Sequence, residues 1–199
     1  MMFATGCIGL VAAARARAGL AFPAARAGRI PQLLVALVVG LAVSWVPFEF
    51  GRRARAVPHI HDITTDVTHP PQFVAVLPLR AGSPNGVAYG GREIAELQHK
   101  AYPDIEPLVL RAPPGAAFAR ARDAAEALGW AIVAADSATG RLEATATTFW
   151  FGFKDDIVVR VTPEGSGSRV DVRSVSRVGR SDLGTNARRI REFLAMLKP

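Results

Sequence analysis

An uncharged run of 19 residues, Ile30–Phe48, interrupts a chain whose charged residues are otherwise widely spread. As a helix rising about 1.5 Å per residue, it would extend about 28 Å, close to the thickness of a bilayer's hydrocarbon core. Its apolar residues lie on every side and leave no polar face, which is atypical of a core helix in a soluble protein. Pro31 suits the first helical turn, and Trp45 and Phe48 suit a membrane interface. The pattern predicts a transmembrane helix at about residues 30–48.

The residues around this run predict a membrane anchor over residues 1–56. Residues 1–14 are also uncharged, and their length suits either part of a first membrane helix or an interfacial helix. Four arginines lie in residues 15–29 and three in residues 49–57, and the more basic flank of a membrane helix usually faces the cytoplasm. We therefore expect a protein of the inner (cytoplasmic) membrane whose soluble part lies on the periplasmic or outer side.

Residues 57–106 show little regular alternation of apolar and polar positions. Residues 58–91 are rich in Pro, Gly, Thr and His, a composition typical of irregular segments. A short helix is indicated at Arg92–Ala101, because Ile94 and Leu97 fall on one face. We interpret residues 57–106 as an extended arm that crosses the domain surface and contributes at most an edge strand.

Residues 107–199 alternate between strand and helix periodicity and predict a compact domain. The order is one strand, one helix, four strands and a final helix. Strands joined by short turns pair in antiparallel fashion. The expected fold is therefore α+β: a two-layer sandwich of about five antiparallel strands with two helices on one face. The helices are predicted at residues 113–128 and 185–197, and the strands at residues 107–111, 130–135 and 141–148 and around residues 157–161 and 170–173.

The location of the charges argues against nucleic acid as a partner. The chain carries a formal net charge of +7. Residues 1–56 hold seven arginines and one acid, Glu49, whereas residues 57–199 hold 17 basic and 16 acidic residues. Binding along a phosphate backbone requires clustered cations, and the predicted domain is close to neutral. The basic excess lies beside the predicted membrane helix, where it suits anionic lipid headgroups.

Four separate motifs are recognisable along the chain: Ile60-His-Asp-Ile-Thr-Thr-Asp66, Gln98-His-Lys-Ala-Tyr-Pro-Asp-Ile105, Thr147-Thr-Phe-Trp-Phe-Gly-Phe-Lys-Asp-Asp156 and Ser174-Val-Ser-Arg-Val-Gly-Arg-Ser-Asp-Leu-Gly-Thr-Asn186. Together they resemble the domain of unknown function 1499 family, and the resemblance covers roughly Val57–Leu197. Bacterial members of that family often carry N-terminal membrane helices, which agrees with the predicted anchor. The resemblance implies no established reaction, cofactor or catalytic residue. A weaker, architectural resemblance links the order of elements to the helix-grip domains of BamC-type envelope lipoproteins.

A cluster of aromatic and charged residues is the candidate docking surface. Four rings within six residues exceed what one core face absorbs, so some could meet lipid or a protein partner, although core packing is the alternative. Charged residues on the two neighbouring strands could form a polar docking edge, or simply an ion-pair ladder on a solvated face. The candidate residues are Phe149, Trp150, Phe151, Phe153, Asp155, Asp156 and Arg173.

The loop before the last helix is a candidate anion site. Arg177, Arg180 and Ser181 lie beside a predicted helix N-terminus, where backbone N–H groups favour anions such as a lipid phosphate. Asp182 opposes this hypothesis by repulsion, and Ser181 or Asp182 could instead cap the helix. His59 and His61 could offer metal ligands, but a closed site normally needs four. We predict no catalytic residue, metal or cofactor.

The sequence therefore leaves three hypotheses for function. We expect a membrane-anchored, non-catalytic accessory or assembly protein that contacts membrane lipid and docks on a membrane-protein partner. The alternative is a carrier or sensor that binds a lipid or small amphipathic ligand between sheet and helices. An enzyme of unknown type is the third hypothesis.

Overall fold

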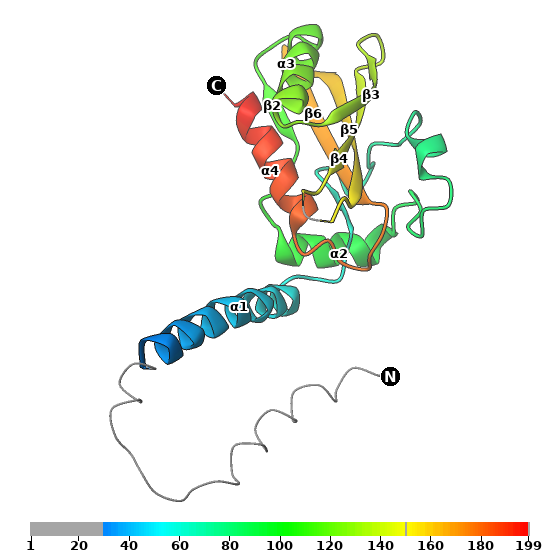
Figure 1. Cartoon of the computed structure of the whole chain (residues 1–199). Helices are drawn as coiled ribbons and strands as arrows, with labels where there is room; N and C mark the ends of the chain where they lie inside the picture. The colour runs from blue at the N-terminus through cyan, green and yellow to red at the C-terminus, as the bar shows by residue number, and fades with distance from the viewer. Residues whose placement is uncertain (1–29, 150, 199) are drawn as a thin grey trace, which may run out of the picture. The chain divides into compact units, whose positions relative to one another are not determined.

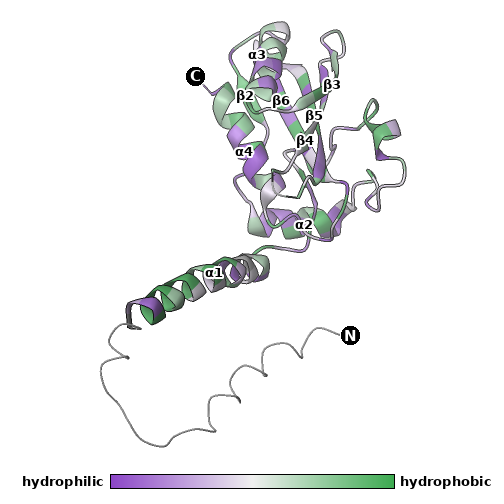
Figure 2. Ribbon diagram, viewed as in Figure 1, coloured by the Kyte–Doolittle hydropathy of each residue, from purple (hydrophilic) through white to green (hydrophobic). Residues whose placement is uncertain are grey.

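The computed structural model describes residues 30–149 and 151–198 and divides the chain into two compact units, Met1–Gly51 and Arg52–Pro199. Helix α1 runs over Ile30–Ala56, and its stretch Pro31–Glu49 is long and apolar enough to cross a membrane. The apolar residues of this stretch are exposed around the helix (Figure 2). By length and composition it suits a membrane anchor and equally an N-terminal signal sequence. The predictions for residues 1–29 lie outside the described residues.

Six strands of the described residues form one open antiparallel sheet in the order β1-β6-β5-β4-β3, and β2 also pairs with β6. Strand β6 is central: β5 pairs with it along one side, while β1 and β2 pair with opposite halves of its other side. This confirms the predicted antiparallel sheet, and β1 adds a strand from the segment interpreted as an arm. The strands are β1 Asp62–Thr64, β2 Leu108–Leu110, β3 Ala131–Asp136, β4 Arg141–Thr147, β5 Lys154–Glu164 and β6 Gly167–Ser176.

Two helices, α3 (Pro114–Ala127) and α4 (Thr185–Leu197), cover one face of the sheet, as predicted (Figure 1). Both lie within one residue of their expected bounds. Trp130 stacks on Phe193 of α4 with ring centroids 5.1 Å apart. The strands contribute alternate apolar residues to this core, namely Leu142, Ala144, Ala146, Ile157, Val159, Val161, Val170 and Val172.

The opposite face of the sheet is covered by the segment between β1 and α2 (Gly91–Ala101) (Figure 1). This segment includes a short 3-10 helix, Leu77–Arg80. Its Phe73 and Val76 form a second small core with Val158 and Val175 of the sheet. The expectation of a solvated face is therefore wrong: the face carries charged residues, but the segment folds back over it and buries them.

Helix α2 lies at the edge of the sheet beside β1. The Gln98 side chain accepts a hydrogen bond from the Thr64 N–H (3.0 Å) and donates one to the Thr64 carbonyl oxygen (2.7 Å). The buried amide thus replaces a neighbouring strand for β1, whose backbone groups would otherwise be unsatisfied. Residues 57–106 therefore belong to the same compact unit as residues 107–199.

Candidate functional site

The loop between β4 and β5 presents phenylalanine rings to solvent. Phe149, Phe151 and Phe153 are 89%, 75% and 51% exposed. The rings of Phe151 and Phe153 stack with centroids 5.6 Å apart. These three residues therefore do not pack in the core. Trp150 lies outside the described residues.

Backbone hydrogen bonds close this loop at its base. Thr148 N–H donates to the Phe153 carbonyl (2.8 Å), and Phe153 N–H donates to Thr148 Oγ1 (2.9 Å). Gly152 N–H donates to the Thr148 carbonyl (3.0 Å), and Gly152 takes the left-handed φ of 63° that this tight turn requires. We call residues 148–153 the aromatic loop.

Asp155 lies on the helix-covered face of the sheet, inside the domain. Arg189 of α4 donates to its carboxylate (2.7 Å) and also to Ser174 Oγ (3.1 Å). Asn186 joins the same network through Ser174 and Ser176. All of these side chains are buried. The network attaches the first turns of α4 to β5 and β6.

Asp156 points to the other face and is fully buried. Thr145 Oγ1 and Arg80 Nη1 each donate to its carboxylate at 2.6 Å, and Arg177 donates at 2.8 and 2.9 Å. Burial alone would raise the pKa of Asp156. The hydrogen bonds from Arg177, Thr145 and Arg80 outweigh it and hold the pKa below its usual value.

Arg173 is the largest fully buried side chain of the domain. Its guanidinium donates to both carboxylate oxygens of Asp62 (2.9 and 2.7 Å) and to the carbonyls of Pro71 and Val87. The rings of Phe73 and Tyr89 lie 5.3 and 5.5 Å from it. Burial, with a smaller effect of the Asp62 carboxylate, raises the pKa of Tyr89 to about 12.

The candidate docking residues therefore separate into two groups. Phe149, Phe151 and Phe153 lie on the surface, whereas Asp155, Asp156 and Arg173 are inside the domain and present no polar edge to a partner. The charged residues do form ion pairs, as one of the two interpretations predicted. However, Asp155 pairs with Arg189 of α4, and Asp156 pairs with Arg80 of the segment between β1 and α2, which we call the covering segment. Sequence reasoning missed Arg80 and Glu143, which are buried between the sheet and the covering segment together with Asp156 and Arg173.

The candidate anion-site residues point to different partners. Arg177 pairs with Asp156, and Ser181 Oγ bonds the Pro58 carbonyl (3.3 Å), whereas Arg180 is exposed. The carboxylate of Asp182 accepts from the N–H groups of Gly184 (3.0 Å) and Asn186 (2.7 Å) at the start of α4. Asp182 thus occupies the place of an external anion. Burial raises its pKa, although these two hydrogen bonds oppose the shift.

A cleft of about 430 Å³ opens beside the aromatic loop, and sequence reasoning did not find it. It is bounded by the α3–β3 connection, the end of β4 and the first turns of α4. The periodicity of the strands carries no signal for it, because its walls come from three parts of the chain that are distant in sequence. Its walls include Leu128, Trp130, Ala146, Phe149, Phe151, Thr185 and Arg188.

The histidines do not assemble into a metal site in the part of the chain that the structure describes. Within residues 30–149 and 151–198, no group of three or more His, Cys, Asp or Glu side chains is placed to hold a metal ion. The buried acids instead bind arginines or backbone N–H groups.

Comparisons with known proteins agree with the family resemblance. The family model described as "Protein of unknown function (DUF1499)" matches residues 62–197. No curated protein matches the chain significantly. Among solved structures, the crystal structure of TTHA0849 from Thermus thermophilus is 16% identical, with 46% of this chain and 90% of that chain covered. Its TM-score of 0.28 is too low to support a conclusion.

Proposed function

The chain belongs to the DUF1499 family, whose function is unknown, and we propose that it is a membrane-anchored, non-catalytic accessory protein that docks on a membrane-protein partner. The contact surface in this proposal is the aromatic loop. Stretch Pro31–Glu49 of α1 serves as the anchor, and the domain lies on the periplasmic or outer side of the inner membrane.

The exposed phenylalanines are the observation that carries the proposal. Aromatic side chains are enriched at protein interfaces, because they bury a large apolar area with few rotatable bonds. The hydrogen bonds of Thr148 with Gly152 and Phe153 close the base of the loop before binding, which lowers the entropic cost of association. Three such rings in one short loop are more than scattered surface apolar residues would give.

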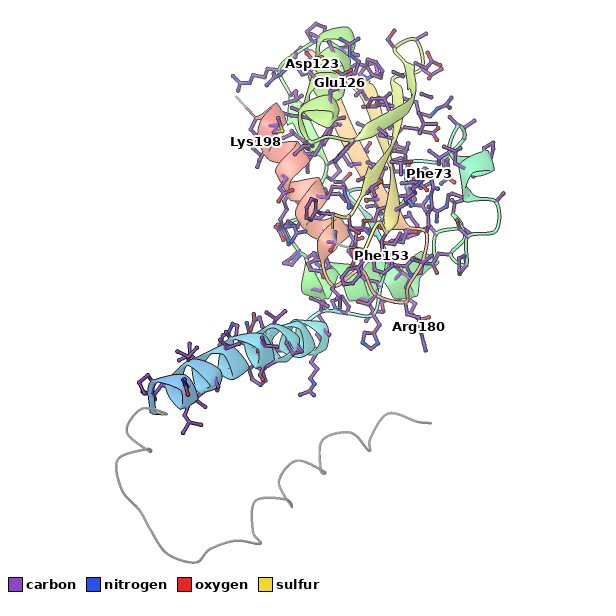
Figure 3. The ribbon with its side chains drawn as sticks, in the orientation of Figure 1. Phe73, Asp123, Glu126, Phe153, Arg180 and Lys198 are labelled. Atoms are coloured by element: carbon purple, nitrogen blue, oxygen red, sulfur yellow. The ribbon has the colours of Figure 1, made fainter. Side chains whose placement is uncertain are left out.

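The same end of the domain receives the chain that leaves α1. Pro58 and Ile60 accept hydrogen bonds from Ser181 and Asp182 in the loop after β6. At the start of the same loop, Arg177 N–H donates to the carbonyl of Lys154, the residue that follows the aromatic loop. Figure 3 shows Phe153 and Arg180 at this end. Because α1 precedes the domain in the chain, anchoring of α1 would keep the domain close to the bilayer, which favours a partner and lipid within the membrane.

The buried acids support a structural role for the domain's charged residues. Glu143 accepts hydrogen bonds from Val74 and Val76, and Asp155 and Asp156 bind arginines. Each carboxylate holds one element of the fold against another. None of these three carboxylates lines the cleft, and their oxygens are bound by groups of the domain itself. We therefore assign them to stability.

Co-purification from native membranes tests the proposal. The full chain is extracted in mild detergent beside a variant with Phe149→Ser, Phe151→Ser and Phe153→Ser. A matched control replaces three other exposed apolar residues, Leu79, Val109 and Met196, by serine. We expect one membrane protein to accompany the natural chain and the control, and to be lost from the loop variant.

Two results would overturn the proposal. Recovery of the natural chain without any protein partner would remove the docking role. Equal recovery of a partner with the loop variant would show that the contact lies elsewhere on the molecule.

A further inference from the structure

The cleft beside the aromatic loop has one apolar wall that is firmly held. Leu128, Trp130 and Ala146 contribute to it, and the Trp130 ring is fixed by its stacking on Phe193. Phe149 and Phe151 line the cleft from the loop side. Its volume of about 430 Å³ falls within the range of roughly 300–1,000 Å³ that is typical of small-ligand pockets. An apolar chain could therefore lie between Trp130 and the two phenylalanines.

The part of the cleft wall that α4 forms is polar. It carries Thr185, Arg188 and Glu192, together with the buried Arg189. Arg189 is committed to Asp155, Ser174 and Asn186. Among the described residues, the Arg188 guanidinium has, in contrast, only a long, solvent-exposed ion pair of 3.7 Å with Glu192. Such exposed pairs contribute little, so an anionic ligand can replace Glu192 at the Arg188 guanidinium.

We propose that this cleft binds a single-chain amphiphile with a carboxylate head group, that is, a fatty acid. The hydrocarbon chain lies against Trp130, Phe149 and Phe151, and the carboxylate pairs with Arg188. Binding at this site does not require the protein partner. The bilayer as the source of the ligand rests on the proposed anchoring, which keeps the domain close to the membrane.

Photolabelling of the full chain in phosphatidylcholine vesicles tests this site. The probe is dodecanoic acid with a diazirine at its terminal carbon, and the labelled residues are mapped by peptide mass spectrometry. We expect labelling in residues 128–130 and 146–151 that excess dodecanoate displaces and excess dodecyltrimethylammonium does not. Labelling of α1 by probe dissolved in the bilayer should resist both competitors.

Two pairs of variants test where the carboxylate and the hydrocarbon chain of the ligand bind. Arg188→Gln should weaken competition by dodecanoate about fivefold, the value of one exposed ion pair. Arg122→Gln is its control, because Arg122 forms a comparable exposed pair with Glu126 at 3.8 Å. Ala146→Leu narrows the cleft at its wall beside Trp130 and should remove most of the displaceable label. Ala131→Leu, on an exposed position of β3, should leave it unchanged.

Three results would contradict the site. These are labelling confined to α1, equal displacement by the cationic competitor, and unchanged labelling in both Arg188→Gln and Ala146→Leu when circular dichroism shows native folding. Since the vesicles contain no protein partner, none of these results depends on the docking proposal.

Discussion

The contribution of an arginine–carboxylate pair to the stability of this domain depends on whether the pair is buried. Arg173 and Asp62 are both buried, so each neutralises a charge that would otherwise be expensive to remove from water. Arg92 and Glu96 form a pair of similar length on the surface of α2, where solvent screens both charges. The N–O distance alone therefore does not indicate how much each pair contributes to stability, whereas burial does.

Replacing Arg173 should destabilise the domain strongly. Arg173→Met leaves Asp62 buried without its cation, and such a change lowers the free energy of unfolding by about 3–5 kcal/mol. Arg92→Gln should change it by less than about 1 kcal/mol. Urea denaturation of the full chain in detergent micelles, followed by circular dichroism, measures both. Equal, small losses would show that the Arg173 pair contributes no more than a surface pair.

Replacing Asp156 should alter the pH dependence of stability. Since folding lowers the pKa of Asp156, the carboxylate's contribution is present above its unfolded pKa of about 3.9 and is lost as the pH falls through the folded value. Asp156→Asn should therefore lower the free energy of unfolding clearly at pH 7, with a gap that narrows below about pH 4. The exposed Asp123→Asn is the control. A gap for Asp156→Asn that is constant between pH 7 and pH 3 would contradict this linkage.

At the scale of elements, the covering segment between β1 and α2 is held by side chains of the sheet. Glu143 accepts from the N–H groups of Val74 and Val76, and Arg173 donates to the carbonyls of Pro71 and Val87. Arg80 inserts from the segment and reaches Asp156 and the Val175 carbonyl. These polar contacts replace the regular ladder that an extended segment of this length lacks.

Weakening one of these contacts should loosen the covering segment more than the rest of the domain. Glu143→Gln removes the charge and one acceptor oxygen from the Val74 and Val76 N–H groups. We expect faster amide hydrogen exchange over residues 73–80 and unchanged exchange in α4. The exposed Glu164→Gln is the matched control. Faster exchange across the whole domain would instead indicate a global loss of stability.

The sequence predicted the regular elements better than the irregular ones. Alternation in β4 and helical spacing in α4 depend only on neighbouring residues, so both were visible in the sequence. The position of residues 66–90 depends on contacts with Glu143 and Arg173, distant in sequence, and the residues themselves show no period. Strand alternation identifies a face of the sheet but not what covers that face. In the sequence, the buried charges therefore resembled surface charges, namely Asp155, Asp156 and Arg173.

At the scale of the whole molecule, docking on a membrane protein requires that α1 anchor the chain in the membrane. If Pro31–Glu49 spans the bilayer, sodium carbonate should leave the full chain in the membrane pellet. A chain that begins at Val57 should move to the supernatant. Release of the full chain, or its appearance without the first 50 residues, would identify the apolar stretch as a cleaved signal sequence or a peripheral helix.

The most direct test of the docking proposal is site-specific photocrosslinking in native membranes. A photoreactive amino acid replaces Phe151 in the aromatic loop or, as the control, the exposed Val109 on β2. We predict one discrete adduct with a membrane protein from position 151 and no such adduct from position 109. Adducts with lipid alone from position 151, or the same protein adduct from both positions, would contradict docking through the aromatic loop.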